Sequence, residues 1–350
     1  MILFSAQKLY QHLLVIFCFL LFSCSDSDPI EDPIDETKEP VIYVFTGQDS
    51  KGSISTFTPS DKTLTFRYTL PARPFLNVRM GEDIYIHSYP TLSFENHLQV
   101  VSTTPDIQVK KQGYYSKYIT WNKQSCFTIA DDKLIVSDNV GFSEQSFLRI
   151  IGKDDLIEQD TVNIDKGRPV IDLLVTNKQL FVSIGNQIKI YSLPTFKQVH
   201  TLDVKGPLVL SFTLDREDNI LVNNGSLFKL DPRNPVSLIS LGYFTSPGFR
   251  PAYNSDDNVL YNISPYAQPA PVAYGLRKMD LSSGRTEDII SGFDEVLDFD
   301  IKFVKYHAES QLIIIGGKDY SSGAGILKTF TKDGKLKQEY TVDMPVIDVF

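Results

Sequence analysis

The sequence predicts an all-β fold, a seven-bladed β-propeller of four-stranded antiparallel blades that is closed by pairing of its N- and C-terminal strands. From residue 41 onward there is almost no helical periodicity, and short runs of alternating apolar residues are separated by turn residues. These runs recur with a period of about 45 residues, which is in the range of propeller blades.

The second strand of each blade is the clearest element of this repeat. Seven copies are present, each a short run rich in β-branched or aromatic residues: VIYVFTG, DIYIHSY, KLIVSDN, QLFVSIG, NILVNNG, VLYNISP and QLIIIGG. In most units a third strand, a tight polar turn and a fourth strand follow, and apolar alternation on both sides of such a turn is typical of a hairpin. The second unit is weaker, so six or eight blades remain the alternatives to seven.

The first strands precede the second strands and complete the units. They are predicted at PFLNV, KYITWN, RPVIDLLV, PLVLSFTL, RPAYN, LDFDIKFV and PVIDVF, which begin at residues 74, 117, 168, 207, 250, 297 and 345. The first unit begins directly at its second strand, VIYVF, and PVIDVF is the copy left over at the C-terminal end. We therefore expect these two segments to share a blade, which closes the ring without an exposed edge.

The first forty residues predict export and lipid attachment. Lys8 precedes the apolar run Leu13–Phe22, which is too short to span a bilayer and is typical of a signal peptide. The sequence LFSC, ending at Cys24, resembles the lipobox of bacterial lipoproteins, whose cysteine is acylated after cleavage. We predict a signal peptide over residues 1–23, lipidation of Cys24, an extended acidic tether over residues 24–40 and a propeller domain over residues 41–350.

Charge and cysteine content exclude several functions. The chain has a formal net charge of −9, much of it in the tether, so a nucleic-acid partner is not expected. Of three cysteines, Cys18 is removed with the signal peptide and Cys24 is acylated, which leaves Cys126 without a disulfide partner. The sequence contains no GxSxG, P-loop or GxGxxG motif, and no cofactor is predicted.

The lipobox, the tether and the blade pattern together resemble the YncE-like propellers, including surface lipoproteins of gut Bacteroidetes. The acids directly after Cys24 also resemble the export signal of such lipoproteins. Some of these proteins bind corrinoids beside a TonB-dependent transporter. The resemblance thus implies lipid anchoring in the outer membrane, a domain that faces the cell exterior, and a transporter as partner. No ligand-binding motif accompanies it.

Loop length predicts where a ligand binds. In a propeller, the loops from second to third strands and those between blades gather on one face. Blades four and five have minimal turns there, IGNQI and NNGSL, whereas other blades have long loops rich in aromatic residues. Such aromatic residues cannot all enter the blade cores, so they predict a contact surface. The predicted ligand-binding residues are Tyr89, Tyr114, Tyr115, Phe142, Arg250, Tyr266, Tyr274 and Tyr320, with Asn186 and Asn224 peripheral.

Two groups of side chains offer metal-binding alternatives. His87 and His97 flank one long loop and could approach each other, although two ligands do not make a zinc site. Four acids on predicted first strands could ring a cation in the channel, and we favour instead that each caps backbone amides of a neighbouring blade: Asp172, Asp298, Asp300 and Asp348. No metal site is therefore predicted.

The sequence favours a non-enzymatic surface lipoprotein that captures a nutrient, such as a corrinoid, a glycan or a peptide, for a transporter. Two alternatives stay open. One is a metal-dependent, lactonase-like hydrolase that uses the channel acids, and the other is a protein docking platform with no small ligand.

Overall fold

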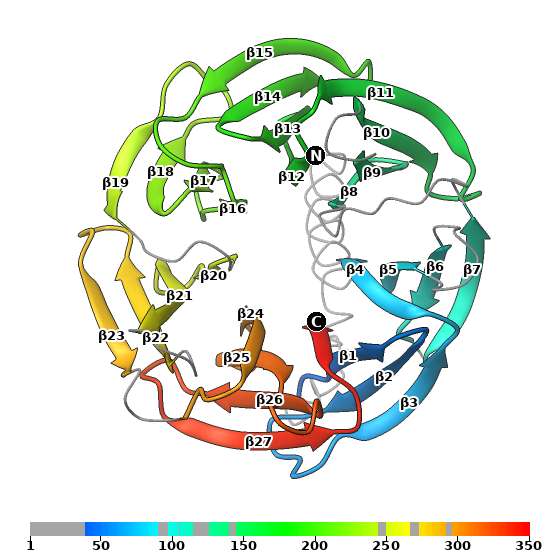
Figure 1. The fold of residues 1–350 in the computed structure, drawn as a ribbon, viewed down its shortest axis with the longest axis vertical. Coiled ribbons are helices and arrows are strands. Elements are labelled where there is room, and N and C mark those ends of the chain that lie inside the picture. The colour runs from blue at the N-terminus through cyan, green and yellow to red at the C-terminus, as the bar shows by residue number, and fades with distance from the viewer. Residues whose placement is uncertain are drawn as a thin grey trace, which may run out of the picture. The chain divides into compact units, whose positions relative to one another are not determined.

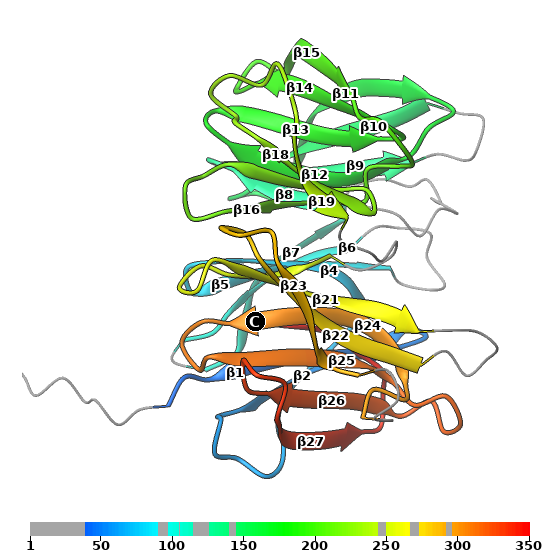
Figure 2. The same cartoon turned by 90° about the vertical axis from the view of Figure 1, so that its left-hand side faces the viewer.

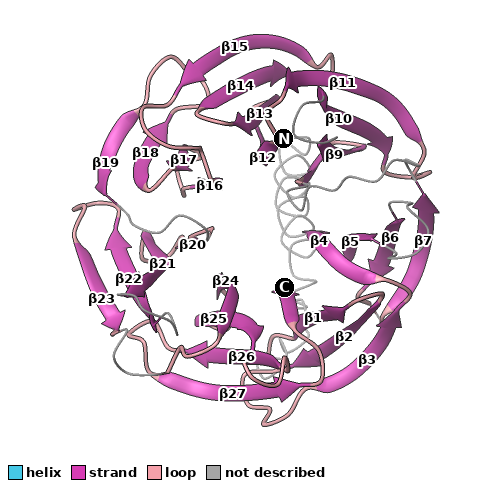
Figure 3. Cartoon of the chain, in the orientation of Figure 1, coloured by secondary structure: helices cyan, strands magenta, loops and turns pink. Residues whose placement is uncertain are grey.

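The computed structural model describes residues 39–89, 97–104, 106–114, 126–139, 145–243, 250–266, 273–291 and 296–350. The compact unit Pro40–Phe350 contains seven four-stranded antiparallel sheets. They are arranged as blades around a ring, which confirms the predicted seven-bladed β-propeller (Figure 1). The strands of each blade follow one another from the inside of the ring to its rim (Figure 3). Nowhere in these ranges is there a helix with the length and hydrophobicity of a membrane span.

The strands of blades two to four run in chain order from innermost to outermost. They are β4 (Arg73–Met80), β5 (Asp83–Tyr89), β6 (His97–Ser102) and β7 (Gln108–Tyr114); β8 (Phe127–Ala130), β9 (Lys133–Asn139), β10 (Gln145–Gly152) and β11 (Glu158–Lys166); and β12 (Val170–Thr176), β13 (Gln179–Ile184), β14 (Gln187–Ser192) and β15 (Lys197–Asp203).

The same order holds in blades five to seven. Their strands are β16 (Ser211–Leu214), β17 (Ile220–Asn223), β18 (Ser226–Leu230) and β19 (Ile239–Tyr243); β20 (Ala252–Asn254), β21 (Val259–Tyr266), β22 (Ala273–Asp280) and β23 (Thr286–Ile290); and β24 (Asp300–His307), β25 (Leu312–Lys318), β26 (Gly325–Phe330) and β27 (Leu336–Val342). All seven predicted second strands are therefore found, as β1, β5, β9, β13, β17, β21 and β25.

Blade one is shared between the two ends of the propeller domain. Its strands, from the inside outward, are β28 (Val346–Val349), β1 (Ile42–Gln48), β2 (Lys51–Phe57) and β3 (Thr65–Leu70). The amide of Tyr43 donates to the carbonyl of Phe350 at 2.7 Å, and the amide of Phe350 donates back to Tyr43 at 2.9 Å. Val346 and Val349 are buried at the closure. The predicted pairing of the terminal strands is confirmed.

The core lies between the faces of adjacent blades, which Figure 2 shows stacked in side view. Second strands are buried along most of their length because both of their faces pack against neighbouring blades, and β25 is buried from Leu312 to Gly317. A single cluster, for example, joins Tyr261 of blade six to Phe330 of blade seven. The outermost strands are mostly exposed, as in β15 and β19, because only one face meets the protein.

The innermost strand of blade three differs from the prediction. That strand is β8, Phe127–Ala130, whereas the predicted segment KYITWN at 117–122 lies outside the described residues. The physical reason is local: Asp131 and Asp132 form a tight turn into β9, with Asp131 in the left-handed region at φ 50°. A two-residue turn pairs β9 with the segment directly before it.

Candidate functional site

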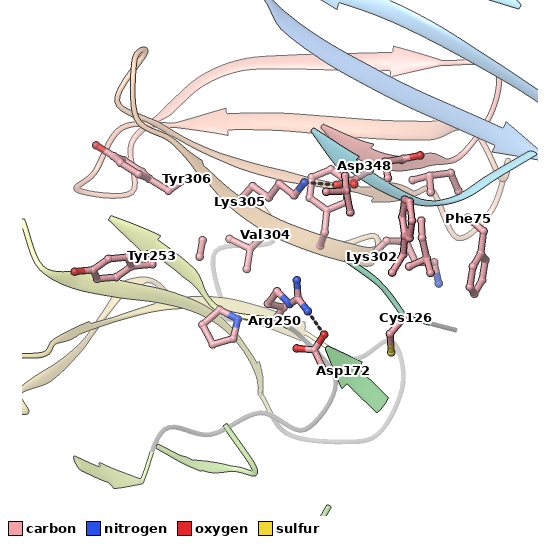
Figure 4. A pocket seen from close by; sticks show the side chains of 18 of the residues that line it. Phe75, Cys126, Asp172, Arg250, Tyr253, Lys302, Val304, Lys305, Tyr306 and Asp348 are labelled. Carbon is pink, nitrogen blue, oxygen red and sulfur yellow. Dashed lines mark hydrogen bonds and ion pairs between the residues drawn. The ribbon is translucent and has the colours of Figure 1, made fainter. Parts of the chain in front are cut away.

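A cavity of about 490 Å³ lies along the central channel of the propeller (Figure 4). Its walls come from the innermost strands of six blades, or from residues that directly precede them. Blade five and its strand β16 contribute no lining residue. The lining is mixed in character, with the apolar rings of Phe75, Phe127 and Phe303 beside the charged groups of Asp172 and Arg250.

An ion pair between Asp172 and Arg250 joins blades four and six across the channel wall. The carboxylate of Asp172 also accepts hydrogen bonds from the amides of Leu173 at 2.9 Å and Phe212 at 2.7 Å. Phe212 belongs to β16 of the next blade, so Asp172 caps a backbone amide of a neighbouring blade as we expected. Asp172 is only 4% exposed, and its charge raises the pKa of Arg250, which keeps the guanidinium ionised.

Asp348, which occupies the position equivalent to Asp172 in the sequence PVID, has different partners. Its carboxylate pairs with the Lys305 ammonium at 2.6 Å and accepts from the amide of the adjacent Val349 at 2.9 Å. Lys305 also donates to the Val349 carbonyl at 2.7 Å and lies 3.9 Å from the centre of the Phe350 ring. We expected Asp348 to cap a backbone amide of a neighbouring blade. Its carboxylate instead accepts from the amide of Val349, within its own strand, so that expectation is wrong for Asp348.

The channel acids pair with different cations rather than with one another. Asp300 contacts Lys302 at 2.8 Å and Lys318 at 3.7 Å, on blade seven. Across the described ranges, no three His, Cys, Asp or Glu side chains come together as a potential metal site. His87 and His97 are both buried, and because Ser88 rather than His87 faces His97 in the β5–β6 register, the two imidazoles point to opposite faces of the sheet.

Cys126 lines the channel cavity but is a poor nucleophile. The side chain is 6% exposed, and its thiol donates to the carbonyl of Ile171 at 2.6 Å. Burial, and then the negative charge of Asp172, raise the pKa of the Cys126 thiol far above its ordinary value. Because the thiolate is the reactive form, Cys126 remains an unreactive, neutral group at physiological pH.

A second cavity, of about 470 Å³, forms the mouth of the channel. It shares Phe75, Lys302 and Ile347 with the channel cavity, so the two cavities are adjacent. Asp49 and Gly323, which also line it, lie in second-to-third-strand connections of blades one and seven. The mouth is thus on the face where the predicted ligand surface lies. Its cationic lining residues are Arg73, Lys302 and Lys318.

Tyr274 and Tyr320 lie together beside this mouth. Partial burial, the contact and hydrogen bond with Tyr274, and the charges of Asp300 and Asp298 raise the pKa of Tyr320 to about 12. Asp300 in turn contacts Lys302 and Lys318 of the mouth. Tyr320 is 49% exposed, whereas Tyr274 is partly buried and packs against the core cluster of blades six and seven, so Tyr320 is the accessible member of the pair.

The loop that carries Tyr320 is organised by Asp319. One carboxylate oxygen of Asp319 accepts hydrogen bonds from the amides and hydroxyls of Ser321 and Ser322, at 2.6 to 3.0 Å. Gly323, at φ +73°, supplies the left-handed residue that closes the turn. These hydrogen bonds strongly lower the pKa of Asp319. The carboxylate therefore stays ionised and holds the loop in place.

The remaining predicted residues divide into four groups. Arg250 follows the connection from β19 to β20, lines the channel cavity and has an exposed side chain. Tyr89, Tyr114 and Tyr266 end strands β5, β7 and β21, and their side chains lie outside the description. Tyr115, Phe142 and the lipidation site Cys24 lie outside the described residues. Asn186 and Asn224 lie in the short turns of blades four and five, away from the lining of both cavities.

Sequence reasoning missed two lysines of the mouth. Lys302 follows the predicted acids in LDFDIKF, and Lys318 begins the loop KDYSSGAG. Lys302 is close in sequence to the predicted channel acids Asp298 and Asp300, and Lys318 is close to Tyr320. This proximity in sequence could have identified both lysines. That they line one cavity with Arg73 depends on blade one lying between blades seven and two, which only ring closure provides.

Comparisons with known proteins support the fold. No protein-family model matches the chain, and no curated protein matches it. Among solved structures, a quinoprotein alcohol dehydrogenase-like protein from Bacteroides thetaiotaomicron has a TM-score of 0.63 at 14% identity, covering 89% of this chain and 78% of that one. Hydrazine synthase from Kuenenia stuttgartiensis has a TM-score of 0.55 at 10% identity, with coverages of 73% and 76%. Sqt1 from Saccharomyces cerevisiae has a TM-score of 0.54 at 12% identity, with coverages of 89% and 85%. At these identities the likeness defines a class by fold alone, the β-propeller proteins.

Proposed function

We propose that this propeller is a non-enzymatic surface lipoprotein that captures a nutrient ligand at the channel mouth. In this proposal Cys24 carries the lipid, the domain faces the cell exterior from the outer membrane, and a TonB-dependent transporter receives the ligand. The nutrient classes are those favoured by the sequence, namely a corrinoid, a glycan or a peptide.

The observation that carries the proposal is the position of the mouth cavity. Its volume of about 470 Å³ is in the range of small-molecule sites, and it adjoins the channel cavity, with which it shares lining residues. The neighbouring Tyr274 and Tyr320 supply flat, rigid rings with hydroxyl groups, which give a large contact area at a small cost in conformational entropy. Such a combination suits a ligand that rests on the face and inserts one group into the mouth.

The bonding of the channel groups favours binding over catalysis. Asp172 stabilises two backbone amides and Arg250, and Asp348 pairs with Lys305. Burial keeps the Cys126 thiol protonated by raising its pKa. A lactonase-like reaction needs several acids on one cation, whereas here Asp172, Asp300 and Asp348 are each paired with basic side chains. The docking alternative would use the same face, so a binding experiment must separate it.

A binding screen with variants tests the proposal. The purified protein is titrated with corrinoids, porphyrins, oligosaccharides and short peptides, and the dissociation constants are measured by calorimetry. For the ligand found, Tyr274→Ala and Tyr320→Ala should each weaken binding by about tenfold, because central aromatic contacts dominate interface energies. Asn186→Ala, which changes an exposed turn residue of blade four, is the matched control and should have no effect.

Three results, from this screen or from parallel assays with partner proteins and lactones, would contradict the proposal. If Asn186→Ala weakened binding while both tyrosine variants bound normally, the site would lie over the short-turn blades. If only intact partner proteins bound, the docking alternative would replace ligand capture. Turnover of a bound lactone that required an added divalent cation would favour the hydrolase.

Membrane anchoring is tested separately. Because acylation needs the thiol of Cys24, Cys24→Ala should move the protein out of the outer-membrane fraction without changing its thermal unfolding. Labelling of cells with a radioactive fatty acid should mark the unchanged chain and not this variant. Unchanged fractionation together with unchanged labelling would refute lipidation at Cys24.

A further inference from the structure

We propose that the channel mouth is an anion-binding subsite, in which Arg73, Lys302 and Lys318 bind a phosphate or carboxylate group of the captured ligand. The inference rests on the proposed capture function and narrows its ligand to an anionic class. Neither the fold class nor any of the structural neighbours indicates such a preference.

Charge at the mouth is the first observation. The cavity is lined by three cationic side chains and by one acid, Asp49, and the acid Asp300 contacts two of the cations from beside it. Among the side chains that line the mouth, three positive charges stand against the single negative charge of Asp49, so the lining itself is net positive in a chain with a formal net charge of −9, and Asp298 and Asp300 lie beside it. A positive cavity in an acidic protein attracts anions selectively, because low-dielectric walls focus the field.

The arrangement of Lys302 and Lys318 is the second observation. Both ammonium groups contact the single carboxylate of Asp300, at 2.8 Å and 3.7 Å. One carboxylate neutralises one ammonium charge, so the pair retains a positive charge while Asp300 keeps the two groups close together. Lys302 also lies at the boundary of the channel, beside Phe75, where Figure 4 shows both side chains. A bound anion would therefore bridge the two lysines.

Arg73 completes the subsite from blade two. Within the described ranges it takes part in no ion pair, and it is exposed at the start of β4. The stem of Arg73 lies against Gly47 of β1, where a Cβ atom would come within 2.9 Å of the arginine Cγ. Glycine at position 47 thus lets the stem pack closely. The planar guanidinium can then offer two parallel N–H groups to a phosphate or carboxylate.

The test uses four monosaccharides of similar size and different charge. Glucose 6-phosphate and glucuronate carry the two anionic groups, glucose is neutral, and glucosamine is cationic. Calorimetry on the purified full chain should give binding of the two anions at least about tenfold tighter than glucose, and weaker still for glucosamine. The two anionic arms distinguish a phosphate from a carboxylate, and affinity for both should fall as ionic strength rises.

Variants with matched charge localise the effect. The double variant Arg73→Gln/Lys318→Gln should lower affinity for the anions at least about tenfold, because it removes charge-assisted hydrogen bonds. Its control is Arg285→Gln/Lys335→Gln, which removes the same charge from exposed third-to-fourth-strand turns on the opposite face. Circular dichroism of both double variants checks that each still folds, and Lys318→Gln alone serves if the first does not.

Each outcome decides the proposal. If both double variants lost the same affinity for the anions, the net charge of the protein alone would explain binding, and the subsite would be refuted. Equal binding of glucose and glucose 6-phosphate would also refute it. Failure of both anions to bind would overturn it as well. The capture function is tested separately, by the effects of the tyrosine variants and of Asn186→Ala on binding. If the ligand were neutral and its binding depended on Tyr274 and Tyr320, the anion subsite would be refuted while the capture function would stand.

Discussion

Blades four and five differ from blades seven and one in how they use the residues of the loop face. In blade five the turn Asn224–Gly225 is closed by its own side chains: Asn224 donates to the Lys205 carbonyl at 3.0 Å and accepts from the Ser226 amide at 3.1 Å. In blade seven the loop is longer, and Asp319 satisfies its backbone while Tyr320 remains 49% exposed. In the short turn, the polar side chains hydrogen-bond to the backbone and stabilise the fold. In the longer loop, Asp319 makes these hydrogen bonds, and the Tyr320 side chain remains exposed for binding.

The channel acids show the same division. Asp172, in blade four, stabilises a backbone amide of the next blade and an arginine 78 residues away. Asp348, in blade one, contacts its own strand and Lys305. Equivalent positions in the repeat therefore differ in role. The acid of blade four connects separate blades, whereas the acid of blade one, on the mouth side, contacts its own strand and one lysine. Five predictions follow from this contrast.

The largest effect is expected from the shared blade. Deleting Met344–Phe350 removes two buried valines and the hydrogen bonds that join β28 to β1, which should cost roughly 5 kcal/mol or more. This loss is comparable with the whole stability of many domains, so urea unfolding should show a strongly destabilised or unfolded protein. Deleting residues 25–38 of the predicted tether is the control. A truncated propeller as stable as the intact one would contradict closure through this strand.

The two equivalent acids should differ in what their loss costs. Asp172→Ala leaves the buried amide of Phe212 without its acceptor and Arg250 without its counterion, so we expect a loss of about 2–3 kcal/mol. Asp348→Ala breaks contacts that are more exposed and should cost about 1 kcal/mol or less. Urea unfolding of both variants measures the difference. Equal losses would remove the proposed distinction between the two sides of the channel.

Removing Asn224 should mainly lower global stability, whereas removing Asp319 should mainly disturb the order of its own loop. Asn224→Ala removes two hydrogen bonds of a buried side chain and should lower stability by about 1–2 kcal/mol, while exchange in the loop 319–324 stays unchanged. Asp319→Ala should instead speed hydrogen exchange of the Ser321 and Ser322 amides at least about tenfold, with little global change. The reverse pattern would contradict the comparison.

Acid should reproduce the Asp319→Ala effect without a mutation. Because the folded pKa of Asp319 is below its ordinary value of 3.8, its stabilisation of the loop is present above that value and is lost as pH falls through the lower folded pKa. Exchange of the Ser321 and Ser322 amides, corrected for the intrinsic pH dependence, should therefore begin to accelerate only below about pH 4. Acceleration near neutral pH would point to a different titrating group.

The smallest effect concerns Cys126, which should not react in the native protein. Burial and the nearby Asp172 raise the pKa of its thiol, so alkylation by iodoacetamide at pH 8 should be negligible until urea unfolds the chain. In Asp172→Ala the thiol loses the charge that raises its pKa while burial still raises it, so labelling should become measurable but stay slower than in the unfolded chain. Rapid labelling of the native protein would show that the channel wall opens more readily than the packing indicates.

Much of the fold was determined by the sequence alone, because blade structure depends on local alternation and on turns. The seven second strands and the closing segment PVIDVF could be read from adjacent residues, since each forms a hairpin or carries a β-branched run. The innermost strand of blade three was mislocated because an apolar segment with alternation also precedes it, and the Asp131–Asp132 turn decided the pairing.

Tertiary structure decided the site. Asp172 contacts Arg250 and Phe212, and Arg73 lines one cavity with Lys302 and Lys318, only because the ring brings separate innermost strands and blade edges around one channel. The sequence period predicts that these strands are central, but it does not say which side chains of different blades come into contact. Those contacts depend on the stagger of each strand and on ring closure, which are set by packing across the whole propeller.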